Sequence, residues 1–546
     1  MTQFHELIKQ ERYEELWLKC CGFIDLSLDN FMKIQKQLLL EQLELIKKCQ
    51  LGQYLLNGTN PHNVDEFREQ VPLTTYADYA PYLMKRRKTV LPEKPLVWLR
   101  SSGEPGEYPY KWIPVTGRLY QELGSVMLGV LLFSSCRKRG DIMLREHDKY
   151  LYALAPSPYL SGISGRRIDE ESIFDFLPPL DDAEGMELGS RVQQGFEMAL
   201  TEGMDICAGT SSTLSVAGER FSQISGNIDM GSFLSSPRAL IRLIKGMIKS
   251  KLAGRPMLPK DVWSLKGIVA GGTYSTVLRE RIKRMWGCNP LEMYACSETM
   301  IIATQTWDYQ GMTFIPNLNF LEFIPEKDSL KSRENPSYRP ETFLLDEVKA
   351  GEKYELVVTS FLGGAMVRYR LGDLITITSL RNDNLDIDIP QMEFYSRVDE
   401  LIDIDGMTQL TEDIIWQALE RSEINCRGWA ACQKIHTEST GLRLYLELSD
   451  NKYKYEEDIT LGINEQLKKL DNNYARIERL TGKRPLEVTL LRPDAFQEYR
   501  KTQQTSGIDM AQFRMPHVNP PESMLEFLVN GSRDVIVTSA REKQPA

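Results

Sequence analysis

The sequence has few of the residues that hold metals or form disulfide frameworks. Five histidines are scattered along 546 residues, and no paired-histidine or Cys-x-x-Cys spacing occurs. A zinc site held by protein ligands is therefore not expected. The nine cysteines are odd in number and irregularly spaced, which is typical of reduced thiols. We expect a cytoplasmic protein.

Long apolar runs and basic clusters are also missing. No apolar run approaches the length of a membrane span, and the N-terminus is charged and then amphipathic, unlike a signal peptide. The net charge is −10 with a pI near 5.4, and no Lys/Arg block interleaves with aromatic residues. We therefore expect small-molecule partners, no nucleic acid and no membrane, and a monomer.

The length of the chain indicates more than one domain. A chain of 546 residues is too long for a single core, and its 42% hydrophobic content supports a large folded body. Strand and helix patterns change character near residue 397. We predict an α/β fold with a large N-terminal domain, residues 1–396, and a smaller α+β C-terminal domain, residues 397–546.

The most informative stretch is Leu-Glu-Met-Tyr-Ala-Cys-Ser-Glu at residues 291–298. An apolar strand end here carries an aromatic ring, a hydroxyl and a carboxylate within five residues. Tyr294 is suited to stacking on a flat base, and Ser297 and Glu298 to facing phosphate and Mg²⁺. The alternative is that Tyr294 is an ordinary core residue.

The residues upstream predict one α/β unit. Residues 265–270 are strand-like and end in Gly271-Gly272, where missing side chains allow a ligand to approach the backbone. A helix follows, because apolar residues recur at helical spacing and Gly287 is a plausible stop. In open parallel sheets, strand ends of this kind border the ligand crevice.

A second candidate anion site lies between two short strands. Residues 97–99 run into a Ser/Gly loop that begins Arg-Ser-Ser-Gly, and Lys111 precedes the next strand. Hydroxyls and backbone N–H groups at such a turn form an anion cradle, and Lys111 adds a point charge. An ordinary hairpin turn explains the same residues.

Gly372-Asp373 interrupts an apolar run that we divide into two strand halves with a tight turn between them. Asp is depleted inside strands, so accepting two ribose hydroxyls is one reason for its presence. A turn-forming Asp is the other.

Several other segments are assigned structural roles. Residues 4–56 and 118–135 are predicted to be helical, and Gly209-Thr-Ser-Ser is predicted to cap a helix. Ser236-Pro237 begins an amphipathic helix whose apolar stripe, Leu240, Ile241, Ile244, Met247 and Ile248, we interpret as packing residues. Residues 158–190 are interpreted as loop-rich, and residues 325–341 as a surface loop.

In this order the segments resemble the acyl acid-amido synthetases that conjugate plant hormones such as auxin and jasmonate, relatives of the firefly-luciferase adenylating superfamily. The resemblance covers most of residues 95–516. Its motifs are Ser101-Ser102-Gly103 with Lys111 (phosphate loop), Tyr294 to Glu298 (adenine and Mg²⁺), Tyr369 to Asp373 (ribose), the Arg397 region (hinge) and Gln512-Phe513-Arg514-Met515-Pro516, where Arg514 replaces a lysine.

The resemblance implies that ATP and Mg²⁺ are the cofactors and that the enzyme activates a carboxylic acid as an acyl-adenylate, then transfers the acyl group to an amine, usually an amino acid. The implied catalytic residues are Glu298, Lys111 and Arg514, with Glu298 also the metal ligand. Ser101, Ser102, Gly103, Gly271, Gly272, Tyr294, Ser297, Asp373 and Arg397 are the implied cofactor-binding residues. No covalent nucleophile is required, in keeping with the absence of an evident Ser-His-Asp or Cys-His arrangement.

One departure from the family pattern leaves alternatives open. Glu104-Pro105 replaces the hydroxyl residue that follows Ser-Ser-Gly. A glutamate there repels phosphate by roughly 4 kcal/mol at about 4 Å and an effective dielectric near 20, enough to reduce ATP affinity about a thousandfold unless it points away. Together with Arg514, this departure motivates the alternative of a catalytically impaired binding or regulatory protein with this fold. A CoA ligase of the same superfamily is a separate alternative, distinguished by whether a thiol or an amine accepts the acyl group.

Overall fold

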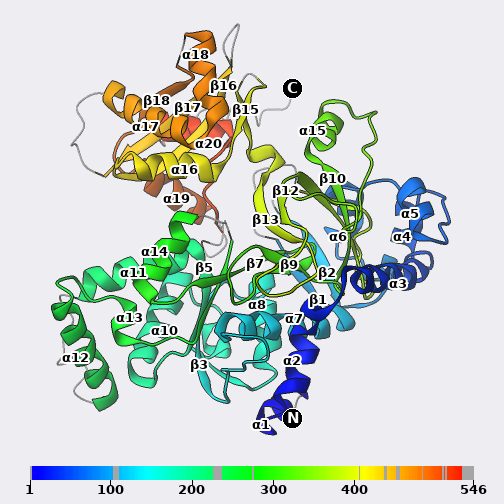
Figure 1. Cartoon of the computed structure of the whole chain (residues 1–546), viewed down its shortest axis with the longest axis horizontal. Coiled ribbons are helices and arrows are strands. Elements are labelled where there is room, and N and C mark those ends of the chain that lie inside the picture. The colour runs from blue at the N-terminus through cyan, green and yellow to red at the C-terminus, as the bar shows by residue number, and fades with distance from the viewer. Residues whose placement is uncertain are drawn as a thin grey trace. The chain divides into compact units, whose positions relative to one another are not determined.

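The computed structural model describes residues 3–101, 108, 110–225, 236–272, 276–404, 406–435, 440–449, 456–482, 484–506, 510 and 513–531. These residues divide into two compact units, a large unit that runs to Phe394 and a small unit that begins at Tyr395. The domain limits 1–396 and 397–546 stay a prediction. Figure 1 gives the order of the elements along the chain.

The large unit is built on an 11-stranded mixed sheet within the described part of the chain, in the order β10-β11-β12-β13-β9-β8-β7-β6-β5-β3-β4. The strands are β3 (Asp148–Ala153), β4 (Phe174–Leu177), β5 (Ile206–Thr210), β6 (Gly267–Gly271), β7 (Pro290–Cys296), β8 (Met300–Thr304), β9 (Met312–Phe314), β10 (Asn319–Pro325), β11 (Lys353–Ser360), β12 (Tyr369–Ser379) and β13 (Gln391–Arg397). The strands from β4 to β7 pair in parallel. β7 pairs antiparallel with β8, so the sheet changes character at β7. The predicted α/β class is confirmed.

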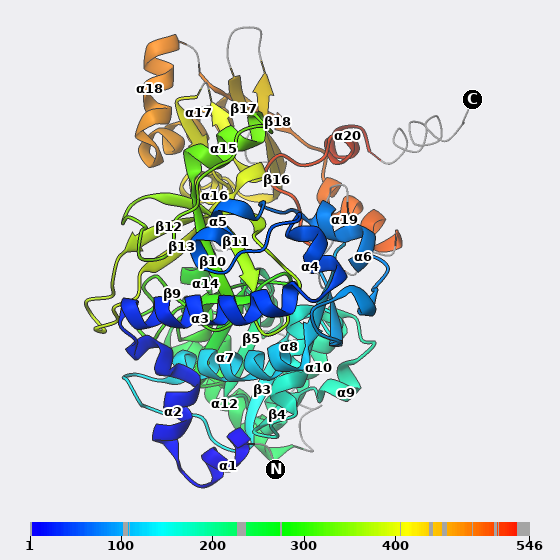
Figure 2. The ribbon, with the colours of Figure 1, turned by 90° about the vertical axis from the view of Figure 1, so that its right-hand side faces the viewer.

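Side-chain alternation along the parallel strands creates a core on each face of the sheet. Ile206 and Ala208 of β5 belong to the core that includes α7, whereas Cys207 between them packs with α10 and α14 residues on the other face. A strand buried on both faces is apolar throughout, which explains the continuous apolar runs. α7 lies over β6, β7 and β8, and Figure 2 shows it alongside the sheet.

The helices of the large unit surround this sheet. They are α1 (Gln3–Lys9), α2 (Tyr13–Cys21), α3 (Leu28–Ile46), α4 (Gln50–Leu55), α5 (Val64–Gln70), α6 (Tyr76–Leu83), α7 (Gly117–Ser135), α8 (Leu160–Asp169), α9 (Leu180–Ala183), α10 (Leu188–Glu202), α11 (Ser211–Ile224), α12 (Pro237–Leu252), α13 (Pro259–Val262), α14 (Thr276–Trp286) and α15 (Glu326–Glu334). A separate antiparallel pair consists of β1 (Pro95–Arg100) and β2 (Trp112–Thr116).

The predicted unit of strand, Gly-Gly, helix and strand is present as β6, α14 and β7. The four apolar residues Leu278, Ile282, Met285 and Trp286 are buried, as their helical spacing predicts. Gly287 follows the last residue of α14 with φ +88°, a conformation that favours glycine and ends the helix. Thr210 caps α11 by accepting from the N–H of Thr213 at 3.1 Å, which confirms the predicted cap.

Four interpretations are wrong. Residues 158–190 contain α8, β4, α9 and the start of α10, and residues 326–334 form α15, so neither stretch is mainly loop. Gly372-Asp373 is not a tight turn: β12 is continuous, and its three residues 371–373 bulge opposite one residue of β11. The apolar stripe of α12 is mostly exposed, because the helix packs through Ala239, Leu243, Gly246 and Ser250 instead.

The small unit is an α+β sandwich. Its central sheet pairs β16 (Cys426–Ile435) antiparallel with β17 (Thr440–Leu448) and β17 parallel with β18 (Leu486–Leu490). α16 (Glu412–Arg421), α17 (Glu456–Leu470) and α18 (Asn472–Thr481) share one core with this sheet, and α19 (Ala495–Thr505) and α20 (Glu522–Asn530) share another. A hairpin of β14 (Ile402–Ile404) and β15 (Thr408–Leu410) precedes it.

Candidate functional site

The turn after β7 brings the carboxylate of Glu298 to the carboxyl edge of the parallel strands. β7 ends at Cys296, Ser297 and Glu298 form the turn, and β8 starts at Met300. Met300 has φ +62°, which turns the chain sharply into the antiparallel neighbour. The amide of Asn319 donates to the carbonyl of Thr299 at 2.7 Å and fastens the turn from β10. Glu298 is buried, with 9% of its surface exposed.

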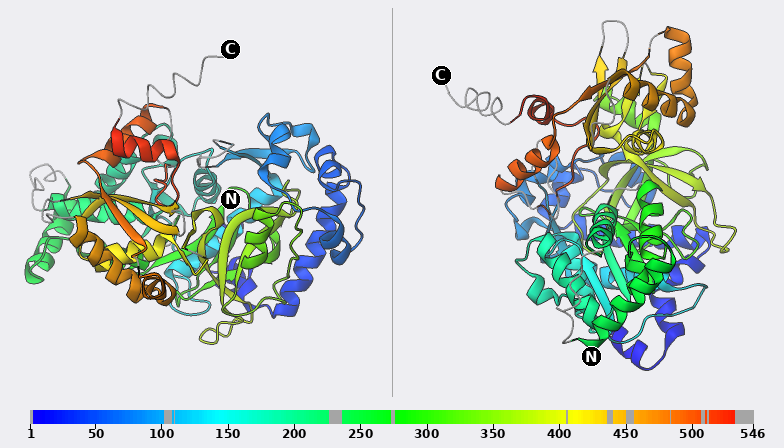
Figure 3. Two further views of the ribbon diagram at one scale, coloured as in Figure 1. Left: turned by 90° about the horizontal axis from the view of Figure 1, so that it is seen from above. Right: turned by 90° about the vertical axis from the view of Figure 1, so that its left-hand side faces the viewer.

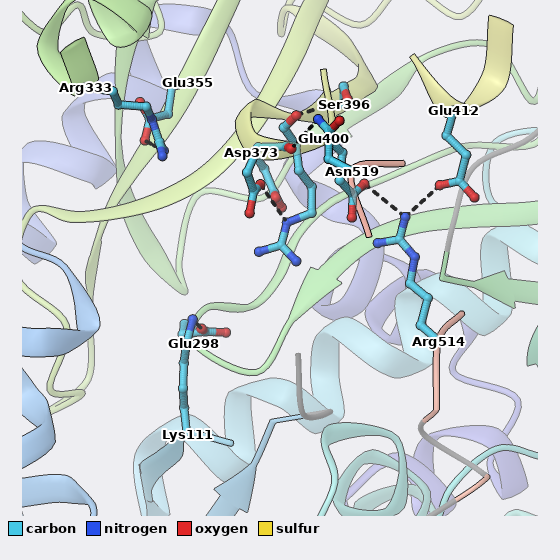
Figure 4. Close-up of polar contacts among 12 residues, drawn as sticks. Lys111, Glu298, Arg333, Glu355, Asp373, Ser396, Glu400, Glu412, Arg514 and Asn519 are labelled. Atoms are coloured by element: carbon cyan, nitrogen blue, oxygen red, sulfur yellow. Dashed lines mark hydrogen bonds and ion pairs between the residues drawn. The ribbon is translucent and has the colours of Figure 1, made fainter. Parts of the chain in front are cut away.

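Glu298 is neutralised by a lysine that comes from a distant part of the sequence. The Nζ of Lys111, just before β2, lies 2.7 Å from Oε1 of Glu298 (Figure 4). The same Nζ donates to the hydroxyl of Tyr369 at 3.1 Å, and that hydroxyl donates to Oε1 of Glu298 at 3.3 Å. Burial first, and then the charge of Glu298, raises the pKa of the Tyr369 hydroxyl, which therefore keeps its proton as a donor.

Two tyrosine rings hold the lysine side chain in place. Lys111 Nζ lies 5.7 Å from the ring centroid of Tyr76 and 5.8 Å from that of Tyr369, within cation–π range. The hydroxyl of Tyr76 accepts from the N–H of Trp112 at 2.8 Å and so fixes the strand next to Lys111. A cavity of about 10 Å³, room for one water molecule, borders Glu298 and is lined also by Thr299, Asn319 and Ser360.

Tyr294 and Asp373 form a second pair in the large unit. The hydroxyl of Tyr294 donates to Oδ2 of Asp373 at 2.5 Å. Asp373 lies in the β12 bulge, where Gly372 has φ +76°, so the bulge needs glycine and turns the carboxylate out of the regular strand pattern. The ring of Phe394 stacks on Tyr294, with centroids 6.0 Å apart and planes at 28°.

The structure requires glycine at only one of the two positions at the end of β6. At Gly271 an added Cβ would meet no described atom within 4 Å, so packing does not require glycine there. At Gly272 the φ of +92° does favour glycine. Gly271 ends β6, the strand that neighbours β7, and Gly272 follows it, while Thr210 ends the next strand at the same edge. Gly271, Gly272 and the turn after Tyr294 thus share one edge of the parallel sheet.

The predicted phosphate loop is described only at its two ends. Its first serine, Ser101, accepts from the N–H of Lys111 at 2.8 Å and donates its own N–H to the carbonyl of Lys111 at 2.9 Å. Ser101 therefore closes the loop and fixes Lys111. Ser102 and Gly103 lie outside the described residues, as does Glu104.

The two predicted arginines belong to the small unit. Arg514 Nη2 contacts Glu400 Oε2 at 3.0 Å and Glu412 Oε2 at 2.7 Å, as Figure 4 shows. Arg397 approaches Asp399, with Nε and Oδ1 4.0 Å apart. The Lys111–Glu298 pair and the Tyr294–Asp373 pair both lie in the large unit.

The contacts of Tyr369 and Tyr76 around Lys111 are not predicted from the sequence. Tyr369 begins the Tyr-Arg-Leu-Gly-Asp motif, so its position in the motif was the available signal. Tyr76 lies at the start of α6, far from any motif, and only the fold places it against Trp112.

The turn after β7 offers a magnesium ion one carboxylate, that of Glu298. No group of three or more His, Cys, Asp or Glu side chains suited to a metal occurs among the residues that the structure describes. Mg²⁺ is commonly held by one or two carboxylates together with substrate phosphates. Glu298 fits that donor set, and a bound ion would compete with Lys111 for this carboxylate.

Three domain models of one family match this chain. The GH3 family N-terminal domain matches residues 20–156, the central domain residues 312–397 and the C-terminal domain residues 415–522. Among curated relatives, the 4-substituted benzoates-glutamate ligase GH3.12 of Arabidopsis thaliana is 27% identical over 232 residues, 40% of this chain and 38% of that protein. The jasmonoyl--L-amino acid synthetase JAR4 of Nicotiana attenuata is 37% identical over 106 residues, 19% of this chain and 16% of its own length.

Solved structures share the whole fold at low identity. The acyl acid amido synthetase AtGH3.15 superposes with a TM-score of 0.65 at 18% identity, covering 93% of this chain and 95% of that one. A 2-hydroxyisobutyryl-CoA ligase in its postadenylation state gives a TM-score of 0.56 at 14% identity, covering 94% and 90%. The sequence matches, in contrast, span less than two-fifths of the length of the first curated relatives.

Proposed function

The chain belongs to the GH3 family. We propose that it is an ATP-dependent ligase that forms an acyl-adenylate and transfers the acyl group to an amine, with an amino acid as the expected acceptor. The observation that carries the proposal is the cluster of Lys111, Glu298 and Tyr369 in the same unit as the Tyr294–Asp373 pair. The names of the relatives, a benzoate-glutamate ligase and a jasmonoyl-amino acid synthetase, support an acyl acid and an amino acid as the two substrates.

In the first half-reaction an oxygen of the substrate carboxylate bonds to the α-phosphorus of ATP, and the bond to pyrophosphate breaks. The chain needs to position the two anions and offset their repulsion, not to supply a nucleophile. Lys111 is a partly buried cation 2.7 Å from Glu298 and is suited to this role once a phosphate oxygen replaces that carboxylate as its partner. Mg²⁺ held by Glu298 would neutralise phosphate charge.

Asp373 and Tyr294 are suited to the nucleoside. The Asp373 carboxylate accepts hydrogen bonds and can take those of ribose hydroxyls, while Tyr294 offers an aromatic face. In the second half-reaction the amine nitrogen bonds to the acyl carbon, AMP leaves and the amine loses a proton.

The test measures the two half-reactions with one panel of substrates. Pyrophosphate release is followed with substituted benzoates, indole-3-acetate and jasmonate, and mass spectrometry then detects the amide after amino acids are added. Replacing the amino acids with CoA distinguishes the CoA ligase alternative, because a thioester would form in place of the amide. We expect acid-dependent pyrophosphate release and an amide product.

A catalytically impaired binding protein is the second candidate. Arg514, which replaces the lysine of the motif that the chain resembles, is held by Glu400 and Glu412 within its own unit. If Glu104→Thr creates or greatly raises adenylation while the wild-type chain shows none, this candidate is favoured. Robust wild-type turnover rules it out.

A further inference from the structure

Helix α12 packs on the large unit through one face, made of three small residues and Leu243. Ala239, Leu243, Gly246 and Ser250 recur every three or four positions and are buried. An added Cβ at Gly246 would come within 2.6 Å of the sulfur of Met257, so the small residues allow the helix to lie close to its neighbours. The isoleucines of α12 and Leu252 lie outside this packed face.

Those larger residues form a second stripe that faces solvent. Ile241, Ile244, Ile248 and Leu252 recur at spacings of three and four, and 43% to 85% of each side chain's surface is exposed. Figures 1 and 3 show α12 at the periphery of the large unit. Single exposed apolar residues are common on soluble proteins, but four in register on one helix mark an interaction surface.

The charges on α12 have one sign. The helix carries Arg238, Arg242, Lys245, Lys249 and Lys251 and no Asp or Glu from Pro237 to Leu252. Arg242 donates to the carbonyls of Leu200 and Thr201, whereas Arg238, Lys245 and Lys249 are exposed and have no ion pair within the described part of the chain. These three cations recur at spacings of seven and four and border the exposed stripe. They stand out in a chain of net charge −10.

We infer that α12 docks on the surface of an anionic lipid membrane. Branched apolar side chains flanked by lysine and arginine suit the boundary between lipid headgroups and acyl chains, where the cations meet lipid phosphate and carboxylate groups. A second copy of this chain is a poorer occupant, since it would place like charges of two α12 helices against each other. The surface is separate from the nucleotide site, so binding does not depend on the proposed function.

This inference departs from the expectation of no membrane partner, which was based on the lack of a long apolar run. No helix among the described residues is long and apolar enough to cross a membrane, so α12 would lie on the surface. Each cation near an anionic surface strengthens binding about fivefold. Binding should therefore be reversible and should weaken as salt is added.

Co-sedimentation of the full chain with vesicles tests the inference. The vesicles are phosphatidylcholine alone or phosphatidylcholine with phosphatidylserine. We expect binding only to the vesicles with phosphatidylserine, falling about 10- to 30-fold in Lys245→Gln/Lys249→Gln and at least tenfold in Ile244→Ser/Ile248→Ser. Matched controls are Lys33→Gln/Lys36→Gln on α3 and Leu461→Ser/Leu480→Ser in the small unit, which are also exposed and should bind like wild type.

All variants should melt within a degree or two of wild type, since they change exposed side chains. The inference is overturned if wild type does not bind anionic vesicles, binds neutral ones equally, or loses as much binding in the controls. It is also overturned if sedimentation velocity without lipid shows a dimer that Ile244→Ser/Ile248→Ser abolishes, because the stripe would then belong to a second copy.

Discussion

At the residue scale, the pairing of Tyr294 with Asp373 decides how the ribose hypothesis is tested. Asp373→Asn keeps the shape and can still accept from the Tyr294 hydroxyl, but it loses the charge that strengthens hydrogen bonds to ribose. Such bonds contribute ~1.5 to 3 kcal/mol each, so we expect ATP affinity to fall by about ten- to a hundredfold or more. Melting without ligand should change little.

Calorimetric titration measures the ATP affinity, and melting curves measure the stability without ligand. Tyr294→Phe is the companion variant, since it retains the ring and removes only the hydroxyl, and its ATP affinity should change less than that of Asp373→Asn. A large fall in the melting temperature of Asp373→Asn with unchanged ATP affinity would make Asp373 a structural residue of the β12 bulge.

The buried carboxyl of Glu292, two residues before Tyr294, should make the stability of the protein depend on pH. Burial raises the pKa of its carboxyl to about 7, and Oε2 of Glu292 has no hydrogen-bond partner among the described residues. Because the folded-state pKa is raised, its stabilising contribution is complete below about pH 4.5 and is lost as pH rises through about 7. Glu292→Gln stays neutral, so we expect it to gain about 2 to 3 kcal/mol over wild type across that interval.

Melting curves of both proteins at about pH 5 and pH 8 check this, with the exposed Glu334→Gln as the matched control. The difference in melting temperature between Glu292→Gln and wild type should increase at the higher pH, whereas the control should melt like wild type. An equal difference in melting temperature at both pH values would contradict a raised pKa of the Glu292 carboxyl.

At the element scale, β12 carries both Tyr369 and Asp373 and is anchored by an ion pair just before its first residue. Arg368 contacts Glu322 of β10 through Nε at 3.1 Å and Nη2 at 2.8 Å, and Glu322 is fully buried. Arg368→Met should cost about 3 to 5 kcal/mol, because it leaves a buried carboxylate without its cation. Chemical denaturation measures the loss.

The double variant Arg368→Met/Glu322→Leu is its control. Replacing both partners removes the uncompensated charge, so most of the stability should return. If the double variant is as unstable as the single one, packing of the arginine side chain, and not its charge, stabilises this part of β12.

The sequence predicts well those elements whose apolar periodicity matches the face that is buried. The β6–α14–β7 unit follows from apolar periodicity and glycine placement alone. The bulge at Gly372-Asp373 could not be predicted, because an interruption in an apolar run looks the same whether the chain turns or bulges. The packed face of α12 is predicted wrongly for a different reason: periodicity identifies the stripe of isoleucines, but the helix packs through Leu243 and three small residues instead.

The site was predictable only in part. Motif order identifies Lys111, Glu298, Tyr294 and Asp373, but the contact of Lys111 with Glu298 joins residues 187 positions apart and depends on the fold. Tyr76 carries no sequence signal at all. The roles of Ser102 and Gly103 remain predictions from the resemblance.

At the scale of the whole molecule, the resemblance predicts that the small unit rotates between the two half-reactions, with its hinge at residues 397–399. The amide of Asn519 donates to the carbonyls of Asp399 and Leu401 at 3.1 and 3.0 Å, so this segment is fastened to the small unit. A few residues at such a boundary can absorb the change in backbone angles. Asp399→Pro restricts them.

We expect Asp399→Pro to depress amide formation more than pyrophosphate release, measured separately on the same protein. Asp399→Ala is the matched control, since it removes the side chain and keeps the backbone freedom, and it should affect neither step strongly. Equal losses in both half-reactions of Asp399→Pro would place the hinge elsewhere.

The most direct test of the central claim is acid-dependent exchange of labelled pyrophosphate into ATP, because only reversible formation of an acyl-adenylate produces it. The measurement uses the full chain with Mg²⁺, ATP and the panel of acyl acids, and Lys111→Met as the variant that removes the cation beside Glu298. We predict exchange with at least one acid, absent without acid and reduced by about a hundredfold or more in Lys111→Met. Measurable ATP binding without exchange for any acid would contradict the account.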